Sequence, residues 1–485
     1  MFNSIYTALQ GMQYASKKLE VSARNVTGAN QEGYARKQAD YSTGPLGLKF
    51  EGIVRAEDIN LSRELGKQNS TLAGLNVEIA ARTALVDALG DPTKGNDLAT
   101  VISNFSQSLK RLGDQPENAT VQSEAAGRAR DVVRMMSSLT ETVQHQRQQA
   151  DRGIGTAVGE VNGMLHSINT LNQRISELPA GADRTDLVDQ REREIAKLMD
   201  YIPVRTIARE DDRVTVLTDT GVTLVNDEVH ELNFTVAPAM EAKSSLSGGQ
   251  LSGLSVDGIN ITPTAITKAP QAPRSGSLQA LFVLRDQAMP QAQRQLDDLA
   301  SVMTAAFQGA DATITNSGTQ GSLFLDGSSP HDRSNAVSIV GLAGRLTLNP
   351  LVDPSAGGEA WRMRDGANAT VRGLPGDATQ VRAYAAVFDN VQTFSPATFL
   401  NTQDSIQNWA TDFISFQGSL RVAAEDKGKY QQTLVSALDS RVAARQGVDM
   451  DQEMQDVMLF ERTYAASAQV FETASKMFDE LLQRV

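Results

Sequence analysis

Both ends of this 485-residue chain carry the same pattern, an apolar stripe whose residues recur at alternating spacings of three and four. This spacing places each stripe on one face of an α-helix. Chain ends usually fray, so a helix with an apolar face at each terminus needs a partner. We expect the two terminal helices to pack with each other and with neighbouring copies of the chain, although a wall of an ordinary intramolecular bundle would show the same pattern. The expected subunit-packing residues are Phe2, Ile5, Leu9, Met12, Leu19 and Val26 (with Ser16 and Ala23 completing the spacing), and Met454, Val457, Tyr464, Ala468, Phe471, Phe478, Leu482 and Val485 (interrupted by Glu461 and Ser475).

The first helical pattern dissolves into a short segment rich in turn-forming residues. Gly28 is a natural C-terminal stop for a helix, and Asn30 and Gly33 suit the turn that follows, just before Tyr34. Residues 34–60 show no helical period. The sequence therefore predicts a turn after the first helix and then an extended or short β segment.

A second long helical pattern runs without a break from 118 to 178, ended by Pro179 and Gly181. A continuous helix over this range would be on the order of 90 Å long at 1.5 Å per residue. A helix of that length is a rod that needs parallel helices beside it. The apolar residues of its second half keep the same spacing, at Val158, Val161, Leu165, Ile168 and Ile175, with Asn172 among them.

The remaining segments alternate between β and helical patterns. Apolar and polar residues alternate around 214–224 within 201–262, which predicts hairpins. A helix is expected near 275–308, short strands and loops over 310–376, and helices again from 378, dominating from 404. The predicted fold is mainly α with inserted β domains. We divide it into an inner terminal-helix assembly domain (1–60 plus 448–485), a long-helix bundle (61–200 plus 378–447) and β-rich outer domains (201–377).

Composition excludes several classes of protein. The formal net charge is −13 without a basic block, which disfavours nucleic-acid binding. The absence of cysteine excludes disulfides, thiolate nucleophiles and Cys-ligated metals. No apolar run approaches the roughly 20 residues that a membrane-spanning helix needs, and the N-terminus lacks the pattern of a cleaved secretory signal. By these rules the chain is cytoplasmic, unless it is exported by a route that reads no cleaved signal.

No catalytic, cofactor or metal site is expected from the sequence. The histidines at 145, 166, 230 and 331 have no metal-ligand spacing. The glycine run at 153–163 lacks a preceding strand and the Lys-Ser/Thr of a phosphate-binding loop, so close helix packing or local flexibility is the preferred reading. Paired carboxylates near 209–213 fit a turn. These observations predict a protein that is not an enzyme.

The two ends resemble those of bacterial flagellar axial proteins, and the chain as a whole is similar to the family of hook–filament junction proteins (hook-associated protein 1). The N-terminal likeness lies in YTALQGMQYASKKLEVSARNVTGANQEGYARKQ, and the C-terminal one in VDMDQEMQDVMLFERTYAASAQVFETASKMFDELLQRV. Two internal segments favour the junction family over hook and rod proteins, SGSLQALFVLRDQAMPQAQRQLDDLASVMTAAF and LNPLVDPS. The chain departs from the family in the turn at 30–34, Asn-Gln-Glu-Gly-Tyr, which lacks the usual proline.

The resemblance implies a structural subunit of the flagellum that joins the hook to the filament as a helical or ring layer. It implies export through the flagellar type III channel without a cleaved signal peptide, and hence an extracellular location. The implied partners are further copies of the chain, the hook protein, a second junction protein or flagellin, and an export chaperone, with no nucleic acid, membrane or cofactor.

Three alternatives stay open from the sequence. The chain could be another axial protein, of the flagellin or the hook and rod type. A secreted enzyme with helical flanks would need a carboxylate pair or a metal set within 201–376, and none is recognised there. A signalling coiled coil is disfavoured by the β insertion.

Overall fold

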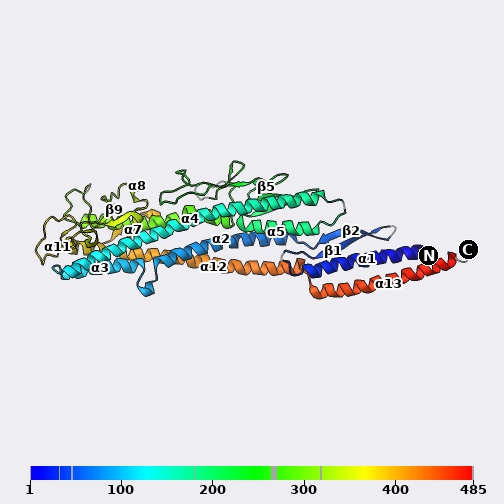
Figure 1. Ribbon diagram of the computed structural model, residues 1–485. Helices are drawn as coiled ribbons and strands as arrows, with labels where there is room; N and C mark the ends of the chain where they lie inside the picture. The colour runs from blue at the N-terminus through cyan, green and yellow to red at the C-terminus, as the bar shows by residue number, and fades with distance from the viewer. Residues whose placement is uncertain are drawn as a thin grey trace.

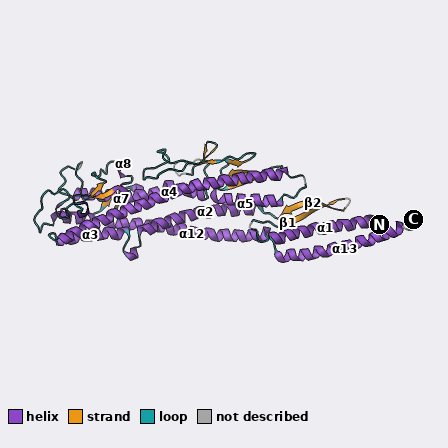
Figure 2. Cartoon of the chain, viewed as in Figure 1, coloured by secondary structure: helices purple, strands orange, loops and turns teal. Residues whose placement is uncertain are grey.

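The computed structural model shows an elongated, mainly helical molecule whose two termini lie side by side at one tip (Figure 1). It describes residues 2–31, 33–44, 47–179, 181–263, 270–316 and 319–482. Helices form a rod along most of the length, and the strands are short and lie along one side or at the junction with the terminal pair (Figure 2). The predicted class, mainly α with small inserted β elements, is confirmed.

The rod is organised around one 59-residue helix, α4 (Ala119–Glu177), which confirms the continuous helix expected over 118–178. The Asn118 side chain caps it by accepting a hydrogen bond from the Thr120 N–H at 3.0 Å. Pro179 follows its last turn and prevents continuation. The helices beside it are α2 (Ile59–Leu89), α3 (Leu98–Asp114), α5 (Thr185–Tyr201), α6 (Ser277–Val283) continuing through the π-helical turn η2 (Leu284–Ala288) into α7 (Met289–Ala310), α11 (Thr379–Asp389) and α12 (Ile406–Gln446).

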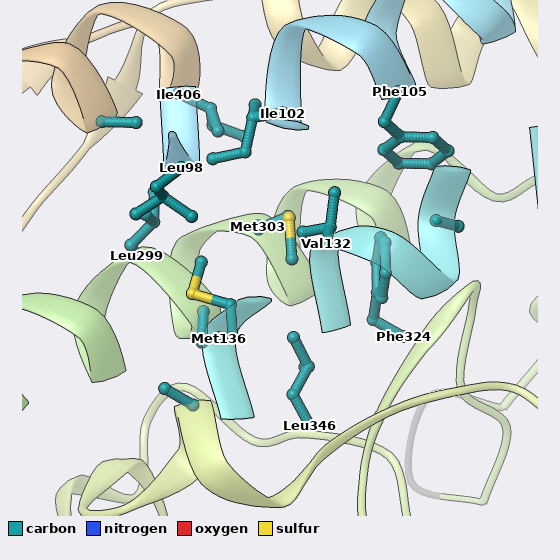
Figure 3. Close-up of a cluster of buried hydrophobic side chains, with 14 of the residues drawn as sticks. Leu98, Ile102, Phe105, Val132, Met136, Leu299, Met303, Phe324, Leu346 and Ile406 are labelled. Atoms are coloured by element: carbon teal, nitrogen blue, oxygen red, sulfur yellow. The ribbon is translucent and has the colours of Figure 1, made fainter. Parts of the chain in front are cut away.

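Large apolar side chains from many parts of the chain form the main core of the rod. Figure 3 shows Leu98, Phe105, Val132, Met303 and other side chains from α3, α4, α7 and α12 converging with residues of two short strands. Phe307 is fully buried, and its ring lies 5.7 Å from that of Phe105, centroid to centroid. Burying aromatic side chains of this size contributes strongly to stability, so this end of the rod has a complete core of its own.

A second core lies between the later half of α4 and the short strands expected at 201–262. The strands β3 (Val204–Ala208), β4 (Val214–Thr218) and β5 (Thr223–Val225) form an antiparallel sheet. Its buried residues, among them Val216 and Leu224, pack on Val161 and Leu165 of α4. The hairpins predicted here are therefore confirmed. The strands β6 (Leu232–Asn233), β7 (Ser255–Val256) and β8 (Ile259–Asn260) form a second small sheet.

The glycine run of α4 is explained in part by close packing. A Cβ on Gly155 would lie 2.4 Å from Val236 Cγ2, and one on Gly153 would lie 3.2 Å from Leu281 Cδ2. Gly159 and Gly163 face open space. The first two glycines thus let the outer β segment and α6 approach the rod closely.

The distal end carries short elements joined by loops, as expected for 310–376. Helix α7 was placed with the outer β-rich domain from the sequence, but its buried face belongs to the main core with α3, α4, α11 and α12. We therefore propose the same three domains with 277–310 assigned to the rod. The distal elements are β9 (Phe324–Asp326), α8 (Ala336–Ile339), α9 (Leu342–Arg345), β10 (Leu346–Leu348), α10 (Arg362–Asp365), β11 (Gln392–Thr393), β12 (Gln403–Asp404) and the 3₁₀ turns η3 (Pro354–Ala356) and η4 (Pro396–Thr398), with η1 (Pro92–Lys94) between α2 and α3.

The terminal unit consists of two helices and one hairpin. Helix α1 (Phe2–Gly28) and helix α13 (Met450–Leu482) form an antiparallel pair beyond the end of the rod (Figure 1). The hairpin of β1 (Lys37–Gly44) and β2 (Gly47–Arg55) confirms the short β segment expected after the first helix, and it lies at the junction with the rod.

Candidate assembly interface at the paired termini

Several small side chains are buried along the contact between α1 and α13. Ala8 and Ala15 are 5% and 0% exposed, and a Cβ on Gly11 would lie 2.7 Å from Ser467 Oγ. Asn25 contacts Glu453 further along. The contacts Gly11–Ser467 and Asn25–Glu453 are fourteen residues apart on both helices, so the pair keeps a heptad-like register over this length.

Three of the buried residues of α1 each come one position earlier in the sequence than a residue of the predicted apolar stripe. Ala8, Ala15 and Ser22 are buried, whereas the following residues Leu9, Ser16 and Ala23 are exposed. The small residues also recur at spacings of three and four, which is a signal the sequence carried. It was missed because alanine, glycine and serine contribute little to an apolar pattern.

The predicted subunit-packing residues are only partly covered by the pairing of α1 with α13. Leu9, Met454 and Tyr464 are 41%, 49% and 46% exposed. Phe2 and Leu482 lie within α1 and α13, and Val485 lies outside the described residues. The half-buried members are Ile5, Met12, Leu19, Val26, Val457, Ala468, Phe471 and Phe478.

Large apolar side chains remain exposed on both helices of the pair. Met458 and Leu459 are 49% and 57% exposed in the first third of α13. Contiguous exposed apolar surface on a folded protein commonly marks a protein–protein contact. The exposed set in the terminal pair comprises Tyr6, Leu9, Met450, Met454, Met458, Leu459, Tyr464, Val470 and Met477.

The predicted turn residues shape the start of the connection from α1 to the rod. A Cβ on Gly28 would lie 2.4 Å from the Tyr34 ring, and Gly33 adopts a φ of +71°, a conformation that side chains with a Cβ rarely take. Asn30 is exposed. Both glycines are thus required by local geometry, and Tyr34 closes the turn by donating its hydroxyl proton to Asn25 Oδ1 at 3.1 Å.

A buried polar joint at this turn ties α1, α13 and the hairpin together, and the sequence reading did not find it. Asn25 is 1% exposed and its amide is fully hydrogen-bonded. Its Nδ2 donates to the Lys37 carbonyl at 2.9 Å and to Glu453 Oε1 at 3.1 Å. Its Oδ1 accepts from the Lys37 N–H at 2.9 Å and from Tyr34. Burial raises the pKa of Tyr34, so the phenol remains a donor at physiological pH.

Ion pairs extend the joint from α13 to the rod. Glu453, 1% exposed, accepts a hydrogen bond from Arg36 Nε at 2.7 Å. The Arg36 N–H donates to the carbonyl of Gln446 at the end of α12. On the other side, Lys37 pairs with Asp186 and lies 3.3 Å from Asp189 of α5.

Two further pairs reinforce the joint from the hairpin and from α1. Arg55 of β2 contacts Asp189 at 2.7 Å, and Arg24 contacts Asp183 at 2.5 Å. Although burial opposes ionisation of Asp183, hydrogen bonds from Thr185 and Arg24 leave its pKa below the usual value. The joint therefore holds the terminal pair in a defined position on the rod.

An aromatic cluster seats the hairpin against the middle of α1. The Tyr14 ring lies 4.9 Å from that of Tyr41 and 6.1 Å from that of Phe460, and Tyr41 lies 5.5 Å from Phe50. Lys18 Nζ donates to the carbonyl of Ala39 at 3.0 Å. The half of α1 nearer the rod thus has two neighbours, whereas its first turns have mainly α13.

The described residues give no sign of a metal centre or a membrane span. No group of three or more His, Asp or Glu side chains within them is placed to hold a metal ion. Among the helices described, none is long and apolar enough to cross a bilayer.

Comparison with known proteins gives matches over nearly the whole chain. The profile described as "Flagellar hook-associated protein FlgK helical domain" matches residues 83–324, and that of "Flagellar basal body rod FlgEFG protein C-terminal" matches 444–484. Flagellar hook-associated protein 1 of Escherichia coli (strain K12) is 22% identical, with 99% of this chain and 100% of the relative covered. The proteins of the same name from Bacillus subtilis (strain 168) and Salmonella typhimurium (strain LT2) are 22% and 23% identical, covering 99% of this chain and 98% and 100% of the relatives.

A solved structure, that of the flagellar hook junction protein FlgK from Burkholderia pseudomallei, aligns with a TM-score of 0.43 at 20% identity. The alignment covers 55% of this chain and 47% of that chain, which is less than half of its length.

The sequence matches, together with a helical rod that ends in paired terminal helices, define a flagellar structural protein. Within that class, the chain belongs to the flagellar hook-associated protein 1 family, as the sequence resemblance indicated.

Proposed function

We propose that this protein is a structural subunit that joins the flagellar hook to the filament, forming a helical layer through its terminal helix pair. The proposal rests on the names of its relatives, hook-associated proteins matched from end to end. It also rests on the form of the molecule, in which one tip carries both termini and the rod carries the cores.

The observation that carries the proposal is the apolar surface left on the terminal pair. Leu9, Met458 and Leu459 remain exposed even though α1 and α13 cover each other through a stripe of small residues. Burying apolar surface is favourable by about 25 cal/mol per Å². Neighbouring copies that cover these side chains would therefore supply the free energy of assembly.

The proposal extends to location, partners and activity. The subunit is exported through the flagellar type III channel without a cleaved signal peptide and is held outside the cell on the flagellum. Its partners are copies of itself, the hook protein, a second junction protein or flagellin, and an export chaperone before assembly. Its role is mechanical and not enzymatic, in keeping with a family of structural flagellar proteins.

The test is made on cells that lack this chain, by electron microscopy of their flagella with flagellin quantified on the cells and in the medium. We expect bare hooks and flagellin lost to the medium, with both defects repaired by the intact gene. Normal filaments in the deleted strain would overturn the proposal.

A further inference from the structure

We propose that residues 237–252 form a strap on the surface of the rod, held closed by a buried cluster of charged side chains, and that this strap opens as one unit while the rod stays folded. The strap lies between β6 and β7, and all its residues are described without a helix or strand among them. The cluster that holds it, called the clasp below, consists of Arg147 and Asp151 of α4 and Arg285 of the turn η2, which are 2%, 1% and 0% exposed. The inference goes beyond the junction role and does not depend on it.

The clasp holds both ends of the strap through their backbone. At the first end, Asp151 Oδ2 accepts a hydrogen bond from the Ala237 N–H at 2.7 Å. At the other end, Arg285 Nη2 donates to the carbonyl of Ser252 at 3.0 Å. Backbone groups that lie outside regular secondary structure need such partners when they are buried, and here charged side chains of the rod provide them.

Arg147 holds the middle of the strap. Its guanidinium donates to the carbonyls of Glu241 and Ser244, at 2.9 and 2.6 Å. The other hydrogen bonds of this stretch are local, such as those from the Ser244 N–H to the Glu241 carbonyl and from the Ser245 N–H to Gln250 Oε1. Local bonds shape the strap but do not attach it to the rod, so Arg147 is its central attachment.

The three members of the clasp are also bonded to one another. Arg285 Nη1 donates to Asp151 Oδ1 at 2.6 Å, and Arg147 Nε donates to the Arg285 carbonyl at 3.0 Å. Partial opening of the strap would leave some of these buried groups without a partner and still without water, which is costly. Complete opening hydrates all of them together. The strap should therefore be either closed or open along its whole length.

The π-helical turn explains why the Arg285 carbonyl is free to accept from Arg147. In a regular α-helix this carbonyl would accept from the Met289 N–H. Here the Met289 N–H donates to the carbonyl of Leu284 instead, and Pro290, the next residue, has no N–H to offer. The turn thus presents a backbone acceptor to α4 at the place where the strap is attached.

The rod does not need the strap for its cores. Among the described residues that make up the two cores, none comes from 237–252. The clasp lies at the boundary between these cores, since the residues that α4 gives to the main core end at Ala150 and those that it gives to the second core begin at Ile154. Opening the strap therefore exposes charged groups to water and leaves both apolar cores covered, which makes it a local opening of the fold.

Trypsin cleavage after Lys243 measures the opening of the strap in the full chain. The Lys243 side chain is exposed, but its peptide bond lies between the two carbonyls that Arg147 holds. Cleavage of a folded chain follows the population of its open form. We expect this bond to be cut about 100-fold more slowly in the intact protein than in a peptide of residues 237–252, as followed by mass spectrometry of the fragments 1–243 and 244–485. Equal rates would show that the strap is not closed and would overturn the inference.

Arg147→Met is the decisive variant, and Arg152→Met, at an exposed site on the same helix, is its matched control. Each variant removes one positive charge and one trypsin site. Arg147→Met should raise the rate of cleavage after Lys243 about tenfold or more, with the helical circular dichroism of the rod retained, and Arg152→Met should leave the rate unchanged. Equal rates in the two variants, or loss of the helical signal together with the opening, would contradict the inference.

Arg147→Lys provides a second measurement that does not remove the buried charge, and it carries the test if Arg147→Met fails to fold. Lysine lacks the planar fork with which arginine reaches several acceptors at once, so cleavage after Lys243 should be faster than in the natural chain and slower than in Arg147→Met where that variant folds. A rate equal to that of the natural chain would show that the guanidinium contacts do not hold the strap. None of these measurements involves flagella, so failure of the strap and failure of the junction role are distinguishable.

Discussion

The rod and the terminal pair are both helical, but they are held together by different kinds of contact. In the rod, Phe105, Phe307 and Phe324 are at most 1% exposed and their rings touch. In the terminal pair, the buried side chains are mostly small, such as Ala8 and Ala15, and several large apolar side chains, among them Leu9 and Met458, are more than 40% exposed. A large side chain that is buried within one chain stabilises that chain, whereas one left on the surface is available to another copy.

Both regions bury ion pairs, Arg285 with Asp151 at 2.6 Å being one in the rod, but the rod also buries a carboxylate that has none. Asp297 in the rod core is buried with hydrogen bonds from the Gly341 and Ala343 N–H groups but no ion pair. Glu453 and Asp189 at the joint are paired with arginine and lysine. We infer that the rod supplies most of the free energy of folding, whereas the joint fixes where the terminal pair sits on the rod.

The largest effect on folding should come from the rod core. Phe307→Ala removes a fully buried ring that contacts Phe105, Phe324 and Phe388. We expect the free energy of unfolding of the rod to fall by about 3–5 kcal/mol, measured by urea denaturation followed by circular dichroism.

Phe399→Ala is the matched control for that measurement, since Phe399 is 72% exposed. Its effect should stay within about 0.5 kcal/mol. Similar losses in the two variants would show that burial in this core does not carry the stability of the rod.

A second prediction concerns pH. Burial raises the pKa of Asp297 from 3.8 to about 6, in spite of its hydrogen bonds. Between pH 4 and 6 the folded chain then binds more protons at this site than the unfolded chain does. The contribution of Asp297 to stability is therefore full below pH 4 and falls by about 3 kcal/mol as the pH rises through 6.

Urea unfolding at several pH values, compared between the natural chain and Asp297→Asn, isolates this contribution. The variant should be less sensitive to pH over this window. The joint should respond to pH with the opposite sign. Hydrogen bonds from Thr185 and Arg24 lower the pKa of Asp183, so the stability that the ionised Asp183 contributes is lost only when the pH falls through this lowered pKa. If the free energy of unfolding of Asp297→Asn falls with pH as steeply as that of the natural chain, Asp297 does not cause this pH dependence.

Elements set by local pattern were predictable from the sequence, and contacts between distant segments were not. The single helix α4 and the strands around Val216 follow from periodicity alone, and so does the presence of a helix at each terminus. The Asn25–Glu453 contact spans 428 positions, and nothing local distinguishes either residue from a solvated one. The placement of α7 in the rod core was missed for a similar reason, since its partners lie on α3, α4 and α12.

A smaller effect is expected at the turn that leads into the joint. Gly28→Ala brings a Cβ to 2.4 Å from the Tyr34 ring and so displaces the phenol that hydrogen-bonds Asn25. We expect a local loss of about 1–2 kcal/mol, seen as faster amide exchange over 15–28. Gly159→Ala, at a helical glycine facing open space, should instead be neutral or stabilising by up to about 1 kcal/mol. A neutral Gly28→Ala would mean that Tyr34 can move without disturbing the joint.

The smallest effect on folding should accompany the largest effect on assembly. Leu9 is 41% exposed, so Leu9→Asp should change the stability of the free subunit by no more than about 0.5 kcal/mol. If neighbouring copies cover Leu9, the new carboxylate would be buried without a partner, at a cost of several kcal/mol. Incorporation into flagella should then be lost, as judged by electron microscopy and by quantifying the subunit on the cell. Val422→Asp on α12, at a site 46% exposed, is the matched control on the rod and should assemble normally. Normal incorporation of Leu9→Asp would show that this face of α1 stays in water. The exposed apolar side chains around Leu9 would then not be contacts between copies of the chain.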